Sequence, residues 1–119
     1  MKIAFIYSEK YKKYEKMIKS IISELKSESK NSQNVFEINI SKATRKKYDL
    51  YIVFSDDESD FDMNISIVKS KPMLITNNLK SDYITHVITK VIDIIYSKNN
   101  ISTIINRINE NLKRQYVKN

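Results

Sequence analysis

The chain contains no cysteine, no glycine and no tryptophan, and it has only one histidine and one proline among its 119 residues. Without cysteine it can form neither a disulfide nor a thiolate zinc site, and one histidine excludes a multi-histidine metal site. Glycine lets backbone N–H groups approach a phosphate closely, so its absence excludes the dinucleotide-binding fingerprint and the P-loop. Zinc chemistry and the glycine-dependent phosphate-binding motifs therefore have no sequence basis here.

Long hydrophobic runs are also missing. No apolar stretch approaches the roughly 20 residues that a membrane helix requires, and the opening run Ile3–Tyr7 is shorter than the apolar core of a secretory signal. We therefore expect a cytoplasmic protein with no membrane partner. The length fits one small domain over residues 1–119, and a hydrophobic fraction of 41% is ordinary for a globular protein.

Five short apolar runs recur along the chain, and helix-compatible segments separate most of them. Ile3–Tyr7, Leu50–Phe54 and Met73–Thr76 are apolar or aromatic almost throughout, which is typical of strands covered on both faces. Val35–Ile40 alternates between apolar and polar residues, and Ile92–Tyr96 contains a carboxylate, so these two suit the edges of a sheet. The prediction is an α/β fold with three layers, in which a doubly wound, parallel, five-stranded sheet has the flavodoxin-like order 2-1-3-4-5.

Helical periodicity predicts the segments that cover this sheet. One apolar stripe runs along Lys10–Ser27, and a shorter one along Phe61–Val68. Tyr83–Val91 has helical spacing, although its β-branched residues disfavour a helix. The last helix begins after Asn100, which can cap it, and carries a stripe over Ile101–Leu112. Between the second and third strands there is room only for a turn or a very short helix.

Positive charge is abundant and clustered, with a formal net charge of +7. Lysines lie mainly off the apolar stripe of the first helix, and a second cluster precedes the third strand. Such patches attract phosphate backbones or acidic partners, and they also occur as solvated helix faces. The basic patch consists of Lys12, Lys13, Lys16, Lys19, Arg45, Lys46 and Lys47.

Acidic residues gather directly after the third strand. They are Asp56, Asp57, Glu58, Asp60 and Asp62. The carboxyl end of a parallel strand is where open α/β sheets bind ligands, so the cluster can hold a hard cation such as Mg²⁺. Acidic residues are also favoured in the first turn of a helix, and this local interpretation is the simpler one. For His86, between apolar positions of the next helix, we expect a packing or surface role.

The layout over most of the chain resembles a response-regulator receiver domain, most clearly over Lys71–Gln115. In that family the first strand ends in an acidic pair that binds Mg²⁺, the third in the phosphorylated aspartate and the fourth in a serine or threonine, and a lysine follows the fifth. Here the acidic pair falls on Tyr7 and Ser8, with Glu9 next, and the phosphoacceptor falls on Phe54.

The resemblance therefore fails at the residues that perform phosphotransfer. Phenylalanine cannot form an acyl phosphate, and the residues at the acidic pair cannot hold Mg²⁺ as two carboxylates would. The hydroxyl position falls on Thr76 or Asn77, and the lysine position on Ser97 with Lys98 adjacent. A displaced acceptor at Asp56 or Asp57, assisted by Glu9 and Lys98, is an alternative. The degenerate receiver pocket comprises Tyr7, Ser8, Glu9, Phe54, Asp56, Asp57, Thr76, Ser97 and Lys98.

This resemblance implies a non-catalytic signalling module without cofactor or metal, which acts on a protein partner and does not depend on phosphorylation. Two alternatives remain. Lys2–Ser8, Tyr14–Ile18 and Tyr48–Ser55 are also similar to the first half of flavodoxins, whose loop after the first strand wraps the FMN phosphate. Here that loop, Ser8–Lys13, has no glycine and contains a carboxylate, which disfavours a small flavin- or nucleotide-binding protein. The other alternative is a nucleic-acid-associated protein that uses the basic patch.

The receiver resemblance also implies a surface for self-association. In receiver-like proteins the last strand and the two helices beside it commonly mediate dimers. The last strand is an edge here, and the helix before it has more β-branched apolar residues than one buried stripe needs. We therefore expect a weak, two-fold symmetric homodimer. The interaction face consists of Tyr83, Val87, Asp93, Arg107 and Asn111.

Overall fold

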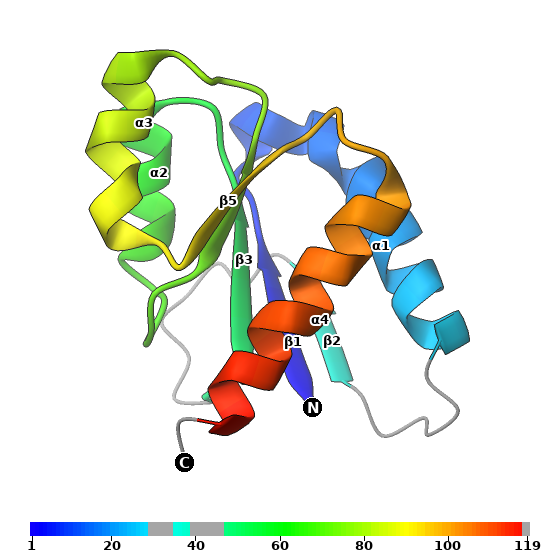
Figure 1. Cartoon of the computed structure of the whole chain (residues 1–119). Helices are drawn as coiled ribbons and strands as arrows, with labels where there is room; N and C mark the ends of the chain where they lie inside the picture. The colour runs from blue at the N-terminus through cyan, green and yellow to red at the C-terminus, as the bar shows by residue number, and fades with distance from the viewer. Residues whose placement is uncertain (29–34, 39–46, 118–119) are drawn as a thin grey trace.

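The computed structural model of this chain describes residues 1–28, 35–38 and 47–117, with side chains described as far as residue 114. The strands are β1 (Lys2–Ile6), β2 (Val35–Ile38), β3 (Leu50–Phe54), β4 (Met73–Thr76) and β5 (Asp93–Tyr96). They form a parallel sheet in the order β2-β1-β3-β4-β5 (Figure 1). This confirms the predicted order, with the two partly polar strands at the edges.

Helices cover both faces of the sheet, so the molecule has three layers (Figure 1). They are η1 (Glu9–Tyr14), α1 (Glu15–Glu28), α2 (Glu58–Ile65), α3 (Ser81–Val87), η2 (Ile88–Lys90) and α4 (Ile101–Val117), where η marks a 3-10 helix. Helices α1 and α4 pack on one face, and α2 and α3 pack on the other. The architecture is the predicted flavodoxin-like α/β fold.

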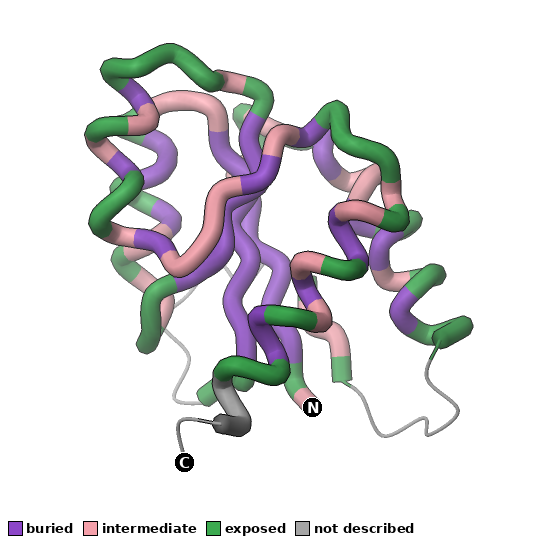
Figure 2. Tube along the Cα trace, in the orientation of Figure 1, coloured by how far each residue is buried: buried purple, intermediate pink, exposed green. Residues whose placement is uncertain are grey.

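Two apolar cores lie on opposite sides of the sheet, because successive strand residues point to opposite faces. In β3, Ile52 and Phe54 belong to the core under α1 and α4, whereas Tyr51 and Val53 belong to the core under α2 and α3. All five residues of this strand are buried (Figure 2). Burial on both faces explains why β3 reads as a continuous apolar run.

Most differences from the sequence prediction concern where helices begin and end. The predicted helix Lys10–Ser27 starts as the 3-10 helix η1, with non-helical dihedral angles at Tyr11, and becomes α-helical only at Glu15. The predicted helix Tyr83–Val91 divides into α3 and η2, as its β-branched residues suggested. Helix α4 is capped as predicted, because Asn100 Oδ1 accepts a hydrogen bond of 2.9 Å from the N–H of Thr103.

The edge strand β2 is only partly as predicted. The alternation of apolar and polar residues along Val35–Ile40 predicts that Phe36 and Ile38 share the covered face of this strand. Phe36 does pack against the core, 6.3 Å from the ring of Phe5, but Ile38 is 43% exposed. An edge strand has a neighbour on one side only, so its end is less completely covered than a central strand.

Some predictions fall on residues outside the described ranges. These are the turn or short helix before β3, together with Ile40, Arg45 and Lys46. Among the described residues, none of the helices combines the length and apolar character that crossing a membrane would require.

Candidate functional site at the carboxyl edge of the sheet

Three hydroxyl-bearing side chains of the segment after β1 face three carboxylates of the segment after β3. Ser8 is the N-cap of η1, and Tyr11 and Tyr14 follow it at intervals of three residues; despite the non-helical angles at Tyr11, all three side chains reach the segment after β3. The hydroxyl group of Ser8 donates to Asp60, that of Tyr11 to Asp57 and that of Tyr14 to Asp56. We call these six residues the carboxyl-edge clasp: Ser8, Tyr11, Tyr14, Asp56, Asp57 and Asp60.

Asp56 is the most heavily engaged carboxylate of the clasp. Its Oδ1 accepts from the Tyr14 hydroxyl at 2.6 Å, from Thr76 Oγ1 at 3.0 Å and from the backbone N–H of Asn77 at 2.8 Å. Its Oδ2 lies 2.7 Å from the ammonium of Lys13. Burial alone would raise the pKa of Asp56, but these donors together lower it below the usual aspartate value. Asp56 is therefore a charged group fixed at the ends of β3 and β4.

Asp57 joins η1 to the start of α2. Its Oδ2 accepts from Lys10 Nζ and from the Tyr11 hydroxyl, each at 2.6 Å, and its Oδ1 accepts from the backbone N–H of Asp60 at 2.8 Å. The last bond makes Asp57 the N-cap of α2, so the local interpretation of this acidic residue is confirmed. The hydrogen bonds from Lys10 and Tyr11 lower the pKa of Asp57 to about 2.

Asp60 is the buried member of the clasp, only 5% exposed. Its Oδ1 accepts from Ser8, and its Oδ2 accepts from Ser55 Oγ at 2.5 Å and from Asn64 Nδ2 at 3.0 Å. A buried carboxylate needs such donors, because an unpaired charge in the interior is very costly. Both oxygens of all three clasp aspartates thus have protein donors.

The clasp also has an apolar base. The ring of Tyr14, which is buried, lies 5.4 Å from the ring of Phe54 at the end of β3. Phe54 itself is fully buried in the core under α1 and α4. The tyrosine therefore packs with its ring and donates with its hydroxyl, as buried tyrosines usually do.

The structure brings together only part of the degenerate receiver pocket predicted from the sequence. Tyr7 turns away, and its buried hydroxyl donates to Glu15 at 2.5 Å. Ser97 reaches only the side chain of Asn77, at 3.4 Å. Glu9 and Lys98 are exposed and make no ion pair or hydrogen bond in the described part of the chain. The predicted helpers of a displaced acceptor are therefore not at Asp56 or Asp57.

Sequence reasoning missed three residues that contact the clasp aspartates, Lys10, Ser55 and Asn64, and assigned Lys13 only to the basic patch. It also did not connect Tyr11 and Tyr14 with the acidic cluster. Their spacing of three from Ser8 was an available signal, since hydroxyl groups at this interval align along a 3-10 helix.

An open cleft of about 450 Å³ adjoins the clasp. It lies between the segments after β1 and β3, which is the topological switch point where this sheet order usually binds ligands. Its lining includes the carboxylates of Glu9, Asp57 and Asp60 and the single ammonium of Lys10. This excess of negative charge weighs against a phosphate-bearing ligand such as FMN.

The acidic cluster shows no arrangement for a cation among the residues that the structure describes, where no group of three or more His, Cys, Asp or Glu side chains could hold a metal ion. Asp62 instead contacts His86, whose Nε2 lies 2.8 Å from its Oδ1, while the imidazole ring packs edge-on against Phe61. His86 is thus a partly exposed packing residue between α2 and α3, as expected.

The predicted interaction face needs correction. Tyr83 and Val87 are 2% and 0% exposed, because both belong to the core under α2 and α3, so they cannot lie on a contact surface. Asp93 accepts from Arg107 Nε at 2.8 Å and from Asn111 Nδ2 at 3.0 Å, which fastens α4 to β5. Asn111 is buried as well. The homodimer stays a prediction, without the three buried residues Tyr83, Val87 and Asn111.

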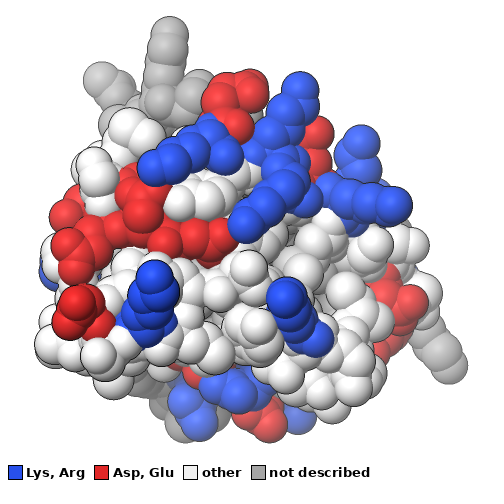
Figure 3. Space-filling model, turned by 90° about the horizontal axis from the view of Figure 1, so that it is seen from above, with Lys and Arg blue, Asp and Glu red and all other residues white. Residues whose placement is uncertain are grey.

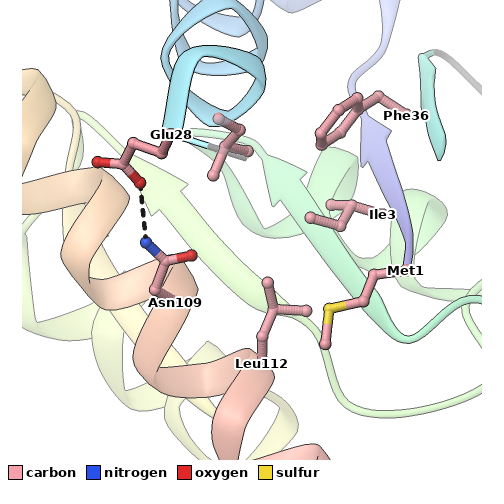
Figure 4. A pocket seen from close by; sticks show the side chains of 7 residues that line it. Met1, Ile3, Glu28, Phe36, Asn109 and Leu112 are labelled. Carbon is pink, nitrogen blue, oxygen red and sulfur yellow. Dashed lines mark hydrogen bonds between the residues drawn. The ribbon is translucent and has the colours of Figure 1, made fainter. Parts of the chain in front are cut away.

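The basic patch is divided by the fold. Lys13 is paired with Asp56, whereas Lys12, Lys16 and Lys19 are exposed and make no ion pair in the described part of the chain. Lys47 is also exposed, on a separate segment before β3. Figure 3, seen from above, shows Lys and Arg side chains gathered beside a band of Asp and Glu.

Comparison of the chain with protein-family models, with curated proteins and with solved structures gives no match. The geometry of the carboxyl edge is therefore the basis on which function can be argued.

The tyrosine hydroxyl groups predict a stability loss at alkaline pH. Burial, strengthened by hydrogen bonds to Glu15 and Glu37, raises the pKa of Tyr7 and of Tyr48 to about 12 from a usual 10.0. Because the pKa is higher in the folded state, the stabilisation is complete below pH 10 and is lost as pH rises towards 12. Absorbance of tyrosinate should appear at higher pH in the native protein than in urea. Coincident titration of the native and unfolded chains would contradict this.

Proposed function

We propose that this chain is a non-catalytic, receiver-like module of the cytoplasm that regulates a partner protein by binding it, independently of phosphorylation. The observation that carries the proposal is the engagement of both oxygens of Asp56, Asp57 and Asp60 by protein donors. An aspartate that accepts a phosphoryl group needs an oxygen free to attack phosphorus. Here the carboxylates instead hold η1 against the loop after β3.

The end of β3 supports the same proposal. Phe54 occupies the position at which receivers carry their phosphorylated aspartate, and its ring is buried between Phe5 and Tyr14, at 6.4 and 5.4 Å between centroids. Aromatic packing stabilises this edge but offers no nucleophile. In this proposal the receiver-like fold serves as a scaffold, and it signals through its binding surfaces and not through a phosphorylated residue.

Incubation with acetyl phosphate and Mg²⁺ tests the proposal. We expect the intact mass to remain unchanged, because Lys13 and the Tyr14 hydroxyl occupy the oxygens of the nearest candidate, Asp56. A phosphorylatable receiver in the same tube serves as the positive control. A mass gain of one phosphate that disappears in Asp56→Asn or Asp57→Asn would overturn the proposal and identify a displaced acceptor.

A further inference from the structure

A groove of about 540 Å³ runs between α1 and the first turn of α4. One side is formed by Lys16, Lys19, Ser20 and Ser23 of α1, and Ile101 contributes an apolar side chain from α4. Glu24 of α1 also lines the groove. The groove is distinct from the clasp and from the cleft beside it, with which it shares no lining residue.

The two lysines of this groove are not engaged in ion pairs with other described residues. Lys16 and Lys19 are three residues apart on α1, so their ammonium groups lie on the same side of the helix, and both are exposed. Neither makes an ion pair in the described part of the chain, unlike Lys10 and Lys13 of η1, which are paired with Asp57 and Asp56. The groove therefore offers two unpaired cations and one apolar side chain among its lining residues.

We propose that this groove binds an acidic segment of a partner protein, with carboxylates on Lys16 and Lys19 and an apolar side chain against Ile101. This inference rests on the proposed protein-binding function and names the surface and the partner's chemistry. Complementary charge at the rim and an apolar contact beneath it are the usual composition of a protein interface.

The extent of the basic surface favours a short acidic segment over a nucleic acid. A duplex presents one negative charge about every 1.7 Å along its axis and requires cations over a long track. Here only two lysines line the groove, and the carboxylate of Glu24 lines it as well. A phosphate backbone lying along the groove would meet Glu24, whereas a short segment can place its own carboxylates on Lys16 and Lys19 alone.

Two double variants of equal net charge test the assignment. Lys16→Glu with Lys19→Glu reverses the charge of the groove lysines. Lys26→Glu with Lys69→Glu reverses the charge of two exposed lysines that do not line the groove. The probe is a fluorescent synthetic peptide rich in glutamate with one leucine, measured by anisotropy at low and at physiological salt. We expect the groove variant to weaken binding about ten-fold and the control variant to change it less than about two-fold. A lysine-rich peptide should bind the groove variant better than the wild type.

Equal weakening by both double variants would overturn the assignment, because it would mean attraction by net charge alone, and so would absence of binding at low salt. If a DNA duplex bound more tightly than the peptide and displaced it, the groove would be a nucleic-acid site and the proposal would be overturned. These results concern only the groove. The proposed function is tested separately: phosphorylation of an aspartate would overturn it, whether or not the peptide binds the groove.

Discussion

Val87→Glu is expected to abolish cooperative folding at neutral pH. Val87 is 0% exposed, at the end of α3, and packs into the core under α2 and α3. A carboxylate placed there has no donor, and burying an unpaired charge costs more than about 4 kcal/mol, a large share of the 5–15 kcal/mol that stabilises a domain. Near-ultraviolet circular dichroism and thermal unfolding measure the loss.

The adjacent residue gives a matched control. Ile88 is 56% exposed, so Ile88→Glu introduces the same charge one position later without entering the core. We expect its midpoint of thermal unfolding to stay within a few degrees of wild type. Lower pH should partly restore Val87→Glu, because burial raises the pKa of a glutamate and protonation removes the charge. Equal behaviour of the two variants would contradict the placement of α3.

Asp60→Ala should cost about 3 kcal/mol of the free energy of unfolding. The substitution leaves the buried donors of Ser55 and Asn64 and the partly buried hydroxyl of Ser8 without their shared acceptor, although Asp57 still connects η1 to α2. Asp60→Asn keeps one acceptor oxygen, and the serine hydroxyls can rotate to accept from its amide, so about 1 kcal/mol should be lost. Urea unfolding followed by circular dichroism gives both values.

Asp62→Ala is the control for this series. Asp62 lies on the same helix, but its side chain is about half exposed and its partners, His86 and Lys90, are at the surface. Exposed pairs contribute up to about 1 kcal/mol, so this variant should lose less than Asp60→Ala. If both cost the same, the three donors to Asp60 do not stabilise the fold as the geometry indicates.

The sheet could be predicted from the sequence because its central strands are buried on both faces. Burial of every residue in Leu50–Phe54 leaves no polar position, and a run without polar positions is visible in the sequence alone. The stripe along Ile101–Leu112 is equally direct, since α4 buries one side. Helix ends were less predictable. The apolar stripe continues across Glu15, where the 3-10 helix becomes an α-helix, so the sequence pattern does not mark this boundary.

The candidate site was harder to predict because it depends on which loops meet. Periodicity correctly made Tyr14 an apolar-stripe residue, but its bond to Asp56 exists only because β1 and β3 are neighbours in register. The interaction face failed for a different reason. Tyr83 and Val87 were transferred by position from a family, although their four-residue spacing is itself the pattern of one buried stripe.

The carboxyl-edge clasp has a consequence for the order in which the molecule folds and opens. Its hydroxyl–carboxylate bonds join residues 42, 46 and 52 positions apart. Contacts so distant along the chain carry a high loop-closure cost until β1 and β3 have paired. The clasp is therefore a late-forming element. The same bonds can break without disturbing the hydrogen-bonded ladder of the sheet, so the part of η1 before Tyr14 can detach and exchange its amide protons while Tyr14 stays in the core.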